Sequence, residues 1–245
     1  MTLLLLETAT DVCSVAVARD GVILAERTAT EAHQHSSHLT LFVQEVLAGA
    51  QVQWPDIGAV VLSDGPGSYT SLRVGAATAK GFCLAWPHLE LRTVSTLAAL
   101  ARREADLRPQ QTEPILATIN SRRGQVYAQL FPAPTPPVVP PQQDAPLWQS
   151  PQNLILTEER WPERVATAAG TIYFLTVGSG RDRVDAHNDR ALPLEFGKTG
   201  HCTAAGLLPL ALNPDTYRTE DIAAYEPLYL NPPFVTKSKK KLLGR

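Results

Sequence analysis

Cysteine is scarce in this 245-residue chain, and long apolar runs are absent. The three cysteines, Cys13, Cys83 and Cys202, lie far apart and form no C-x-x-C pair, which fits buried thiols in a reducing compartment. The apolar run Leu3–Leu6 stops at Glu7, too early for a signal peptide, and no stretch approaches the ~20 apolar residues that a membrane span requires. We therefore expect a cytoplasmic protein without a membrane segment.

A large excess of either charge is also missing. Lys and Arg number 22 and Asp and Glu 24, a formal charge of −2, which excludes a generally basic nucleic-acid coat. Residues 237–245 nevertheless hold five positive charges and no acid, so a body with 17 bases and 24 acids ends in a basic tail. A solvated, flexible tail is the plainer interpretation. The alternative is contact with RNA phosphates through Lys237, Lys239, Lys240 and Lys241.

Signatures of several enzyme classes are lacking. No serine lies in G-x-S-x-G, and the glycine loop at residues 65–70 has no G-K-[ST], so a hydrolase triad and a P-loop are unsupported. The loop joins a strand to a helix, and its amides could hold a phosphate near an acid at the end of the first strand. The alternative is a tight strand–helix turn with Ser68 or Tyr69 near the helix cap. The candidate nucleotide or phosphate residues are Glu7, Gly65, Gly67, Ser68 and Tyr69.

A histidine cluster is the one hint of a metal site. His33, His35 and His38 fall within six residues, and His35 and His38 could both reach one ion. No cysteine completes a closed site there, and Glu31 is a loose candidate for a carboxylate ligand. Surface histidines at the start of a helix are the commoner interpretation, and we expect no metal.

The first hundred residues predict three strands followed by alternating helices and strands. Apolar runs and the turn at Asp20-Gly21 predict an antiparallel meander. The expected elements are strands at 3–8, 13–18 and 22–27, a helix at 36–49, a strand at 59–62, a helix at 69–85, a strand at 91–94 and a helix after Ser95. This order indicates a mixed α/β sheet with helices on its faces, the plan of a ribonuclease-H-like lobe.

The second half of the chain is less regular. A hairpin is expected at 114–120 and 125–131, a strand at 171–177, a helix at 203–212 and a short terminal segment at 225–230. Eight of the 20 prolines lie between Pro132 and Pro151, which predicts an extended surface excursion. We expect an N-terminal lobe at 1–107, a C-terminal lobe at 108–230 and a flexible basic tail at 231–245.

The expected helix at 69–85 is rich in small residues. Its two glycines each cost about 1 kcal/mol relative to alanine in a helix interior. Either close packing on the chain's own sheet or a helix–helix interface with another subunit would explain this composition. The small residues are Gly75, Ala76, Ala77, Thr78, Ala79 and Gly81.

Five strings in the same order resemble the TsaB (YeaZ) family, densely over residues 1–105 and patchily to about 230. They are LETATDVCSVAV at 6–17, GPGSYTSLRVGAATAKG at 65–81, VSTL at 94–97, INSRRGQVY at 119–127 and YEPLYL at 225–230. The resemblance implies an actin-like, sugar-kinase-like (ASKHA) fold of two ribonuclease-H-like lobes. It also implies a bacterial subunit of the machinery that makes N6-threonylcarbamoyladenosine (t6A) in tRNA.

The resemblance further implies a scaffold subunit without a catalytic residue, metal or cofactor. The catalytic paralogue TsaD holds a metal with an H-x-E-G-H motif, and Thr96 and Leu100 stand at the two histidine positions here. Neither side chain is a useful ligand for that ion. The implied role is to bind and activate TsaD, with the ATPase TsaE as a further partner and tRNA bound indirectly. Departures from the family pattern are Glu7 and Asn120, where Asp is frequent, and Ser71 in place of glycine.

By the same resemblance, two helices pair with TsaD and form a homodimer when the chain is alone. The interface carried over comprises Leu39, Phe42, Val43, Val46, Arg73, Gly75, Ala76, Ala79, Lys80 and Cys83. Three other functions stay open. One is an ATP-binding or ATP-hydrolysing enzyme of the same fold that uses Glu7 and the glycine loop. The others are a protease, for which no metal ligands are found, and an RNA-binding module that uses the tail.

Overall fold

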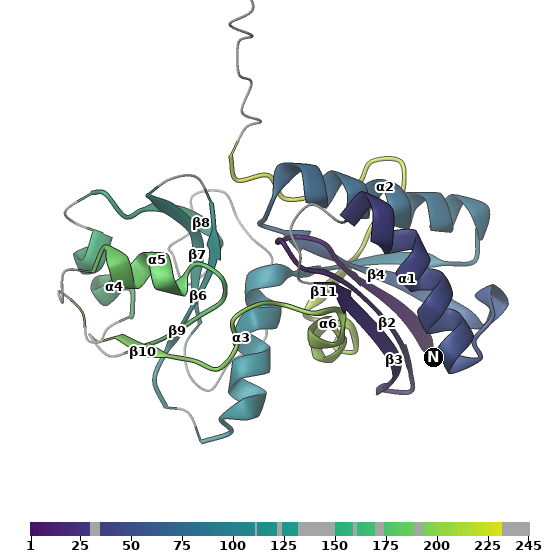
Figure 1. Ribbon diagram of the computed structural model, residues 1–245, viewed down its shortest axis with the longest axis horizontal. Helices are drawn as coiled ribbons and strands as arrows, with labels where there is room; N and C mark the ends of the chain where they lie inside the picture. Colours follow the sequence, from purple (N-terminus) through teal and green to yellow (C-terminus); the bar gives the residue numbers. More distant parts are fainter. Residues whose placement is uncertain are drawn as a thin grey trace, which may run out of the picture.

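Two sheets, each covered by helices, make up the computed structural model of the chain (Figure 1). The structure describes residues 1–29, 35–110, 112–121, 124–131, 150–158, 161–169, 174–188, 192 and 194–231. The Pro-rich stretch up to residue 149 and the basic tail from residue 232 lie outside these ranges. Among the described residues, no helix is long and apolar enough to cross a membrane.

The first sheet has the strand order β11-β5-β4-β1-β2-β3. Strands β1 (Thr2–Glu7), β2 (Cys13–Arg19) and β3 (Val22–Ala29) form the expected antiparallel meander, and its β2–β3 turn has positive φ at Asp20 and Gly21. Strands β4 (Ile57–Gly65) and β5 (Glu90–Ser95) follow in parallel with β1. Strand β11 (Tyr217–Thr219) is antiparallel to β5 at the edge.

Alternation along β1 separates two cores, because successive side chains of a strand point to opposite faces. Leu4 and Leu6 pack beneath α1 (His35–Ala50) and α2 (Tyr69–Ala85). Leu3 and Leu5 pack on the other face with α3 (Thr96–Leu107) and α6 (Ala204–Ala211). The short 3-10 helix η1 (Trp54–Asp56) precedes β4.

The second sheet has the order β10-β9-β6-β7-β8, which repeats the plan of the first. Strands β6 (Ile115–Asn120), β7 (Gln125–Phe131) and β8 (Gln152–Ile155) form an antiparallel meander. Strands β9 (Phe174–Val177) and β10 (Leu194–Phe196) then join it in parallel. Helices α4 (Trp161–Ala169) and α5 (Arg181–Ala186) carry Trp161, Val165 and Val184 into the core of this lobe.

The expected fold class is confirmed, since both sheets are mixed, but the division of the chain differs in one respect. We expected residues 108–230 to form the second lobe, whereas α6 and β11 lie with the first sheet. The helix α6 packs against α3, and β11 extends the edge of β5. The chain therefore leaves the first lobe after α3 and returns to it after β10. Short elements that the sequence analysis did not predict are β8, α4, α5, β10 and β11.

Candidate functional site

Glu7, the acid expected near a nucleotide, is fully buried at the end of β1. Its Oε1 accepts a 2.7 Å hydrogen bond from the Ala9 amide, while Oε2 has no partner among the described residues. Burial raises the pKa of Glu7 from 4.5 to about 7, although the Ala9 amide and the nearby Cys202 and Ser63 side chains act in the opposite direction. A carboxyl group enclosed in this way is not exposed to a metal–nucleotide complex.

The glycine loop after β4 is packed against the turn that follows β1. The Ser68 amide donates a 2.7 Å hydrogen bond to the Ala9 carbonyl, and a Cβ on Gly67 would lie 2.0 Å from that same oxygen. Ser68 caps α2, because its Oγ accepts from the Ser71 amide at 3.5 Å. Tyr69 packs on Tyr229, with ring centroids 4.7 Å apart. The contacts support the turn-and-cap interpretation of this loop over a phosphate cradle.

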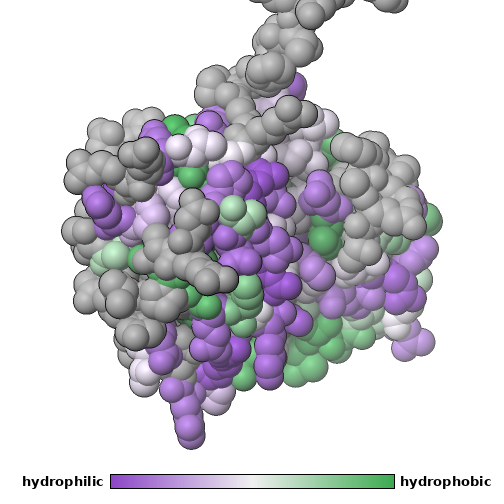
Figure 2. All heavy atoms as spheres, turned by 60° about the vertical axis from the view of Figure 1, so that its left-hand side comes forward, coloured by the Kyte–Doolittle hydropathy of each residue, from purple (hydrophilic) through white to green (hydrophobic). Residues whose placement is uncertain are grey.

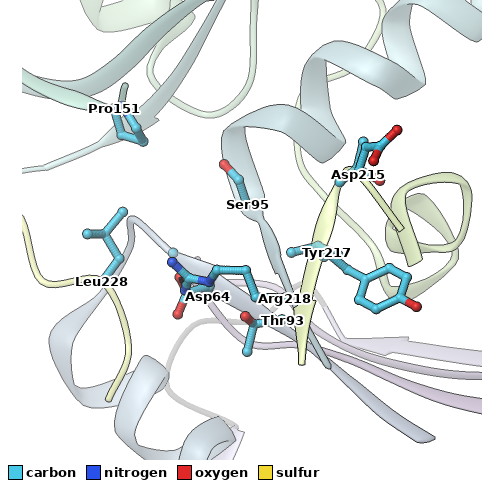
Figure 3. A pocket seen from close by; sticks show the side chains of 11 residues that line it. Asp64, Thr93, Ser95, Pro151, Asp215, Tyr217, Arg218 and Leu228 are labelled. Atoms are coloured by element: carbon cyan, nitrogen blue, oxygen red, sulfur yellow. Dashed lines mark hydrogen bonds and ion pairs between the residues drawn. The ribbon is translucent and has the colours of Figure 1, made fainter. Parts of the chain in front are cut away.

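Beside the loop lies a small pocket between the two lobes, with room of about 40 Å³ (Figure 3). That space suits a few water molecules rather than a nucleotide. Its lining includes the ion pair of Asp64 and Arg218, whose Oδ2 and Nη2 atoms are 2.5 Å apart. Figure 3 shows these two side chains below Ser95, the N-cap of α3. The remaining lining comes largely from β5, β11 and the segments around Pro151 and Leu228.

Asp64 belongs to a hydrogen-bond network that the sequence analysis missed. It accepts from Arg218 and, at 3.1 Å, from the Tyr225 hydroxyl. Arg218 also donates to Glu220, which accepts a 2.6 Å hydrogen bond from the Thr93 hydroxyl. Burial raises the pKa of Asp64, and Arg218 and Tyr225 oppose that rise. No local signal connects these residues, because Asp64 and Arg218 are 154 positions apart.

Glu7 and Asp64 do not form a pair of catalytic carboxylates. Glu7 is on the side of β1 that carries Leu3 and Leu5, toward α6 and Cys202. Asp64 lies two residues after Leu62 on β4, so the two side chains point to the same face of the sheet, and Asp64 accepts a hydrogen bond from Tyr225. Leu62 and Tyr225 both belong to the core beneath α1 and α2. The sheet lies between the two carboxyl groups.

Thr96 and Leu100, the two positions that the resemblance matches to metal-binding histidines of the paralogue, lie inside the protein. Thr96 is the first residue of α3 and fully buried, and its Oγ1 has no partner among the described residues. Leu100 is 1% exposed and packs in the core that the two lobes share. His33 of the histidine cluster lies outside the described residues, as do the side chain of His35 and the four tail lysines. His38 packs its ring edge to face on Phe42.

Most side chains of the interface carried over from the family are buried in the core of this chain, between α1, α2 and the sheet, and they offer little surface to a partner. The interface itself stays a prediction. Gly75 shows why the residues on the buried side of α2 are small, since a Cβ at this position would lie 2.2 Å from the Thr8 hydroxyl oxygen. Packing on the chain's own sheet therefore explains part of the small-residue composition. The buried members are Leu39, Phe42, Val43, Val46, Gly75, Ala76, Ala79 and Cys83.

The surface of α2 is instead formed by a second stripe at the spacing of the helix. We define the α2 stripe as the exposed residues Thr70, Arg73, Ala77, Gly81 and Leu84. Next to it, α1 packs on α2 and exposes Leu41. Gly81 differs from Gly75, because a Cβ at Gly81 would meet no atom within 4 Å. No contact within the part of the chain that the structure describes requires a glycine there.

The two remaining interface candidates, Lys80 and Arg73, are more accessible than the buried residues. Lys80 is half-buried, and its Nζ donates a 2.7 Å hydrogen bond to the Tyr225 carbonyl, which anchors the C-terminal segment on α2. Arg73 is exposed and lies over the Tyr69 ring, 5.5 Å from its centroid. Of the ten residues, Arg73 has the most accessible position for contact with a partner.

Two lobes of one strand order around a shared helix define the class of actin-like, sugar-kinase-like proteins. A family model described as TsaD, tRNA N6-adenosine threonylcarbamoyltransferase, matches residues 22–131. The chain is 28% identical over 233 residues to the tRNA threonylcarbamoyladenosine biosynthesis protein TsaB of Escherichia coli, with 94% of each chain covered.

Two solved structures from Pseudomonas aeruginosa are similar throughout. One, an uncharacterized protein with similarity to peptidase YeaZ, has a TM-score of 0.69 and 26% identity, over 94% of this chain and 99% of that one. The other, YeaZ, has a TM-score of 0.66 and 28% identity, over 86% of this chain and 91% of that one. The chain is thus similar to TsaB (YeaZ) proteins over nearly its whole length, in agreement with the resemblance of its motifs.

Proposed function

We propose that the chain acts in t6A synthesis on tRNA as a partner subunit that binds and activates the TsaD transferase. The TsaB protein of Escherichia coli, which is similar over 94% of this chain, carries the name of this pathway. TsaE, the ATPase expected from the resemblance, completes the proposed machinery, and tRNA is bound through the complex. The observation that carries the proposal is the α2 stripe with its unexplained glycine.

Close approach of another backbone accounts for Gly81. A glycine in a helix interior costs about 1 kcal/mol relative to alanine, and helices keep that cost where a neighbour must come near. No such neighbour exists within the described residues of the chain itself. Ala77, one turn before Gly81 in the stripe, is also small, and Leu41 and Leu84 add apolar area at 46% and 71% exposure. These features suit a helix pair of another subunit.

The family match supports TsaD as that subunit. The matching model describes transferases and covers α1 and α2 of this chain, so a transferase lobe of this kind has an equivalent helix pair. Two such pairs can pack as four helices around a pseudo-two-fold axis. The same geometry explains why the chain alone would form a homodimer through this face.

A scaffold role agrees with the surroundings of Glu7. An ATP-dependent enzyme of this fold would need the acid at the end of β1 to face a bound nucleotide, whereas the Glu7 carboxyl is enclosed by Ala9, Ser63 and Cys202. The glycine loop uses the Ser68 amide to hold the Ala9 carbonyl. The pocket beside the loop is small. These observations favour binding over catalysis as the contribution of this chain.

Co-elution with the TsaD protein of the same organism tests the proposal, with size-exclusion chromatography and light scattering as the measurement. The wild-type chain should form a 1:1 complex that replaces any homodimer. Gly81→Trp should abolish the complex while leaving the circular dichroism spectrum unchanged and without lowering the melting temperature of the monomer, because the site is open. A tryptophan at Ala79 would not serve, since that position is fully buried.

The matched control is Leu107→Trp, which places the same side chain at an exposed position of α3. This variant should bind TsaD like the wild-type chain. A Gly81→Trp variant that still co-elutes with TsaD would disprove the proposed face. A wild-type chain that ignores TsaD but hydrolyses ATP in a manner sensitive to Glu7→Gln would instead favour the enzyme hypothesis.

A further inference from the structure

Two tyrosines at the start of α2 stand apart from the cores of the protein. Tyr69 is the first residue of α2, and Tyr229 belongs to the C-terminal segment that passes beside this helix (Figure 1). Their ring centroids are 4.7 Å apart and their planes are inclined by 46°, so the rings do not cover each other as a parallel stack would. Both residues are partly exposed, and neither belongs to one of the hydrophobic cores.

Tyr127 and Tyr225 show how this fold uses a tyrosine for its own structure. The Tyr225 hydroxyl donates to Asp64 at 3.1 Å, and the ring lies in the core beneath α1 and α2. The Tyr127 hydroxyl accepts a hydrogen bond from the Asn231 amide, and the ring lies in the core that the lobes share. The hydroxyls of the first pair have no hydrogen-bond partner among the described residues. That pair therefore completes neither a core nor a hydrogen-bond network there.

A guanidinium group without an ion pair adjoins the two rings. Arg73 is exposed one turn after Tyr69, with its Cζ atom 5.5 Å from the centroid of that ring. It makes no ion pair among the described residues, whereas the likewise exposed Arg27 is paired with Glu45 at 3.1 Å. We call Tyr69, Arg73 and Tyr229 the tyrosine platform. Such a group offers a ligand both flat surfaces and a positive charge.

Positive charge dominates the chain next to the platform. Residues 237–245 contain five Lys or Arg residues and no acid. Lys237 is eight residues after Tyr229, so the length of the chain alone keeps it within about 28 Å of that residue. Glu226 is an exposed acid close to Tyr229, and it offsets only a small part of this charge. The platform and the tail together suit a polyanion that also presents flat groups.

We propose that the tyrosine platform binds unpaired bases of RNA, while the basic tail contacts the adjoining phosphates. Unpaired bases stack on tyrosine rings and on guanidinium planes with little sequence preference, and lysines neutralise the RNA backbone. An acidic protein would use the charge of the tail but not the flat surfaces. The inference goes beyond the proposed function, in which tRNA is bound through the complex, because here this chain itself contacts RNA. Arg73 also belongs to the α2 stripe, so the RNA lies beside the proposed TsaD face.

Fluorescence anisotropy with the full chain and a short, labelled single-stranded RNA tests the platform. Tyr229→Leu should weaken binding about fivefold or more, because an aliphatic side chain cannot stack on a base. The slope of log K against log salt concentration should not change, since no phosphate contact is lost. Tyr229→Phe, which keeps the ring, should bind within about twofold of the wild-type chain.

Tyr217→Leu is the matched control. Tyr217 is also partly exposed and also has an arginine over its ring, with the Arg92 Cζ atom 4.4 Å from the centroid. Figure 3 shows Tyr217 and Leu228, which precedes Tyr229, on opposite sides of the pocket between the lobes. With the circular dichroism spectrum of each variant checked against that of the wild-type chain, Tyr217→Leu should bind the RNA like the wild type.

A duplex separates stacking from charge. Annealing the RNA to its complement hides the bases in a helix, so Tyr229→Leu should then have no effect on the affinity. A loss of equal size with single-stranded and duplex RNA would overturn the platform. So would equal binding of single-stranded RNA by Tyr229→Leu and the wild-type chain, which would leave a purely electrostatic contact through the tail.

The proposed function has its own test in co-elution with TsaD. A chain that pairs with TsaD but binds no RNA would refute the platform and leave the proposed function in place. A chain that binds RNA in the manner described but does not pair with TsaD would refute the proposed function and support the platform.

Discussion

At the scale of single residues, Glu7 illustrates how burial decides the chemistry of an acid. The same carboxyl group at an open strand end would be charged and able to bind a metal. In this protein it is enclosed by the Ala9 amide and the side chains of Ser63 and Cys202, and one of its oxygens has no partner among the described residues. The neutral form is favoured, because a charge there would be desolvated.

The enclosure predicts a pH dependence of stability. The pKa of Glu7 rises from 4.5 in the unfolded chain to about 7 in the folded chain. The contribution of the protonated Glu7 carboxyl to the free energy of unfolding is therefore fully present below pH 4.5 and is lost as the pH rises from 4.5 to 7. Glu7→Gln keeps an acceptor for the Ala9 amide and removes this loss. We expect the free energy of unfolding of the variant to exceed that of the wild-type chain by about 3 kcal/mol at pH 8.

Urea unfolding at pH 4.5 and at pH 8 measures this effect. The advantage of the Gln variant should be present at pH 8 and nearly absent at pH 4.5. Glu226→Gln, which neutralises an exposed carboxylate, is the matched control and should show no such trend. A wild-type chain with equal stability at both values would show that the Glu7 carboxyl is better solvated than its surroundings indicate.

At the scale of elements, α2 has two faces with different requirements. Its buried side contains Gly75, which lies close to the Thr8 side chain just after β1. Its exposed side contains Gly81, where a Cβ would meet no atom of the described residues within 4 Å. Both glycines look alike in the sequence. Only the orientation of the helix on its sheet distinguishes a packing glycine from one available to a partner.

Alanine at these two positions should therefore have opposite effects on the free chain. Gly75→Ala should lower the free energy of unfolding by roughly 1–3 kcal/mol, because the new Cβ overlaps the Thr8 hydroxyl. Gly81→Ala should raise it by up to about 1 kcal/mol through helix propensity. Thermal or chemical unfolding of the isolated chain measures both, and destabilisation by Gly81→Ala would mean that the glycine serves the fold itself.

The element scale also shows the limit of the family resemblance. The helices α1 and α2 stay the predicted contact elements of the proposed interface, but the residues carried over are mostly those that hold the helices to the sheet. Leu39, Val43 and Val46 lie on the inner side of α1, and Leu41 is exposed beside them. The residues of a family motif can be core residues as well as surface contact residues, since both kinds of position restrict the size and polarity of the side chain.

At the scale of the whole molecule, two lobes with the same strand order share one core. That core contains Leu5 from the first sheet, Leu100 from α3, Ile119 and Leu175 from the second sheet and Leu207 from α6. The C-terminal segment also joins the lobes, because the Asn231 amide donates to the hydroxyls of Ser121 and Tyr127 at 3.1 and 3.2 Å. The face shown in Figure 2 is mostly polar where it is coloured, with hydrophobic side chains gathered along its lower edge.

The charge of the basic tail, residues 237–245, predicts how tRNA binding would depend on salt concentration. If residues 237–245 contact tRNA in the complex, replacing Lys237, Lys239, Lys240 and Lys241 by serine should lower the tRNA affinity. The slope of log K against log salt concentration should fall in magnitude by about 3, since each neutralised phosphate contributes ~0.7–0.9. Fluorescence anisotropy with labelled tRNA at several salt concentrations measures the slope, and the matched Lys→Arg variant should retain it. An unchanged slope after the serine substitutions would exclude the tail from RNA contact.

Much of the architecture follows from local patterns. Apolar runs and the turn at Asp20-Gly21 predicted the meander, and the small residues with the Ser68 cap predicted a helix over the range that α2 occupies. Ser95 caps α3 as expected, its Oγ accepting from the Ala98 amide at 3.3 Å. The expected strand at 59–62 is longer in β4, which continues through Ser63 and Asp64 to Gly65, because β5 pairs with it beyond the polar residues.

The sequence by itself determined the order of the main elements and carried the resemblance to the TsaB (YeaZ) family, since turns, caps and apolar periodicity act over a few residues. The tertiary structure alone decided that Glu7 is sealed beside Cys202, that β11 returns to the first sheet and that Arg218 pairs with Asp64. It also decided which side of α2 faces outward. Each of these depends on contacts between residues far apart in the chain, and desolvation and packing at such contacts are properties of the assembled fold rather than of any segment.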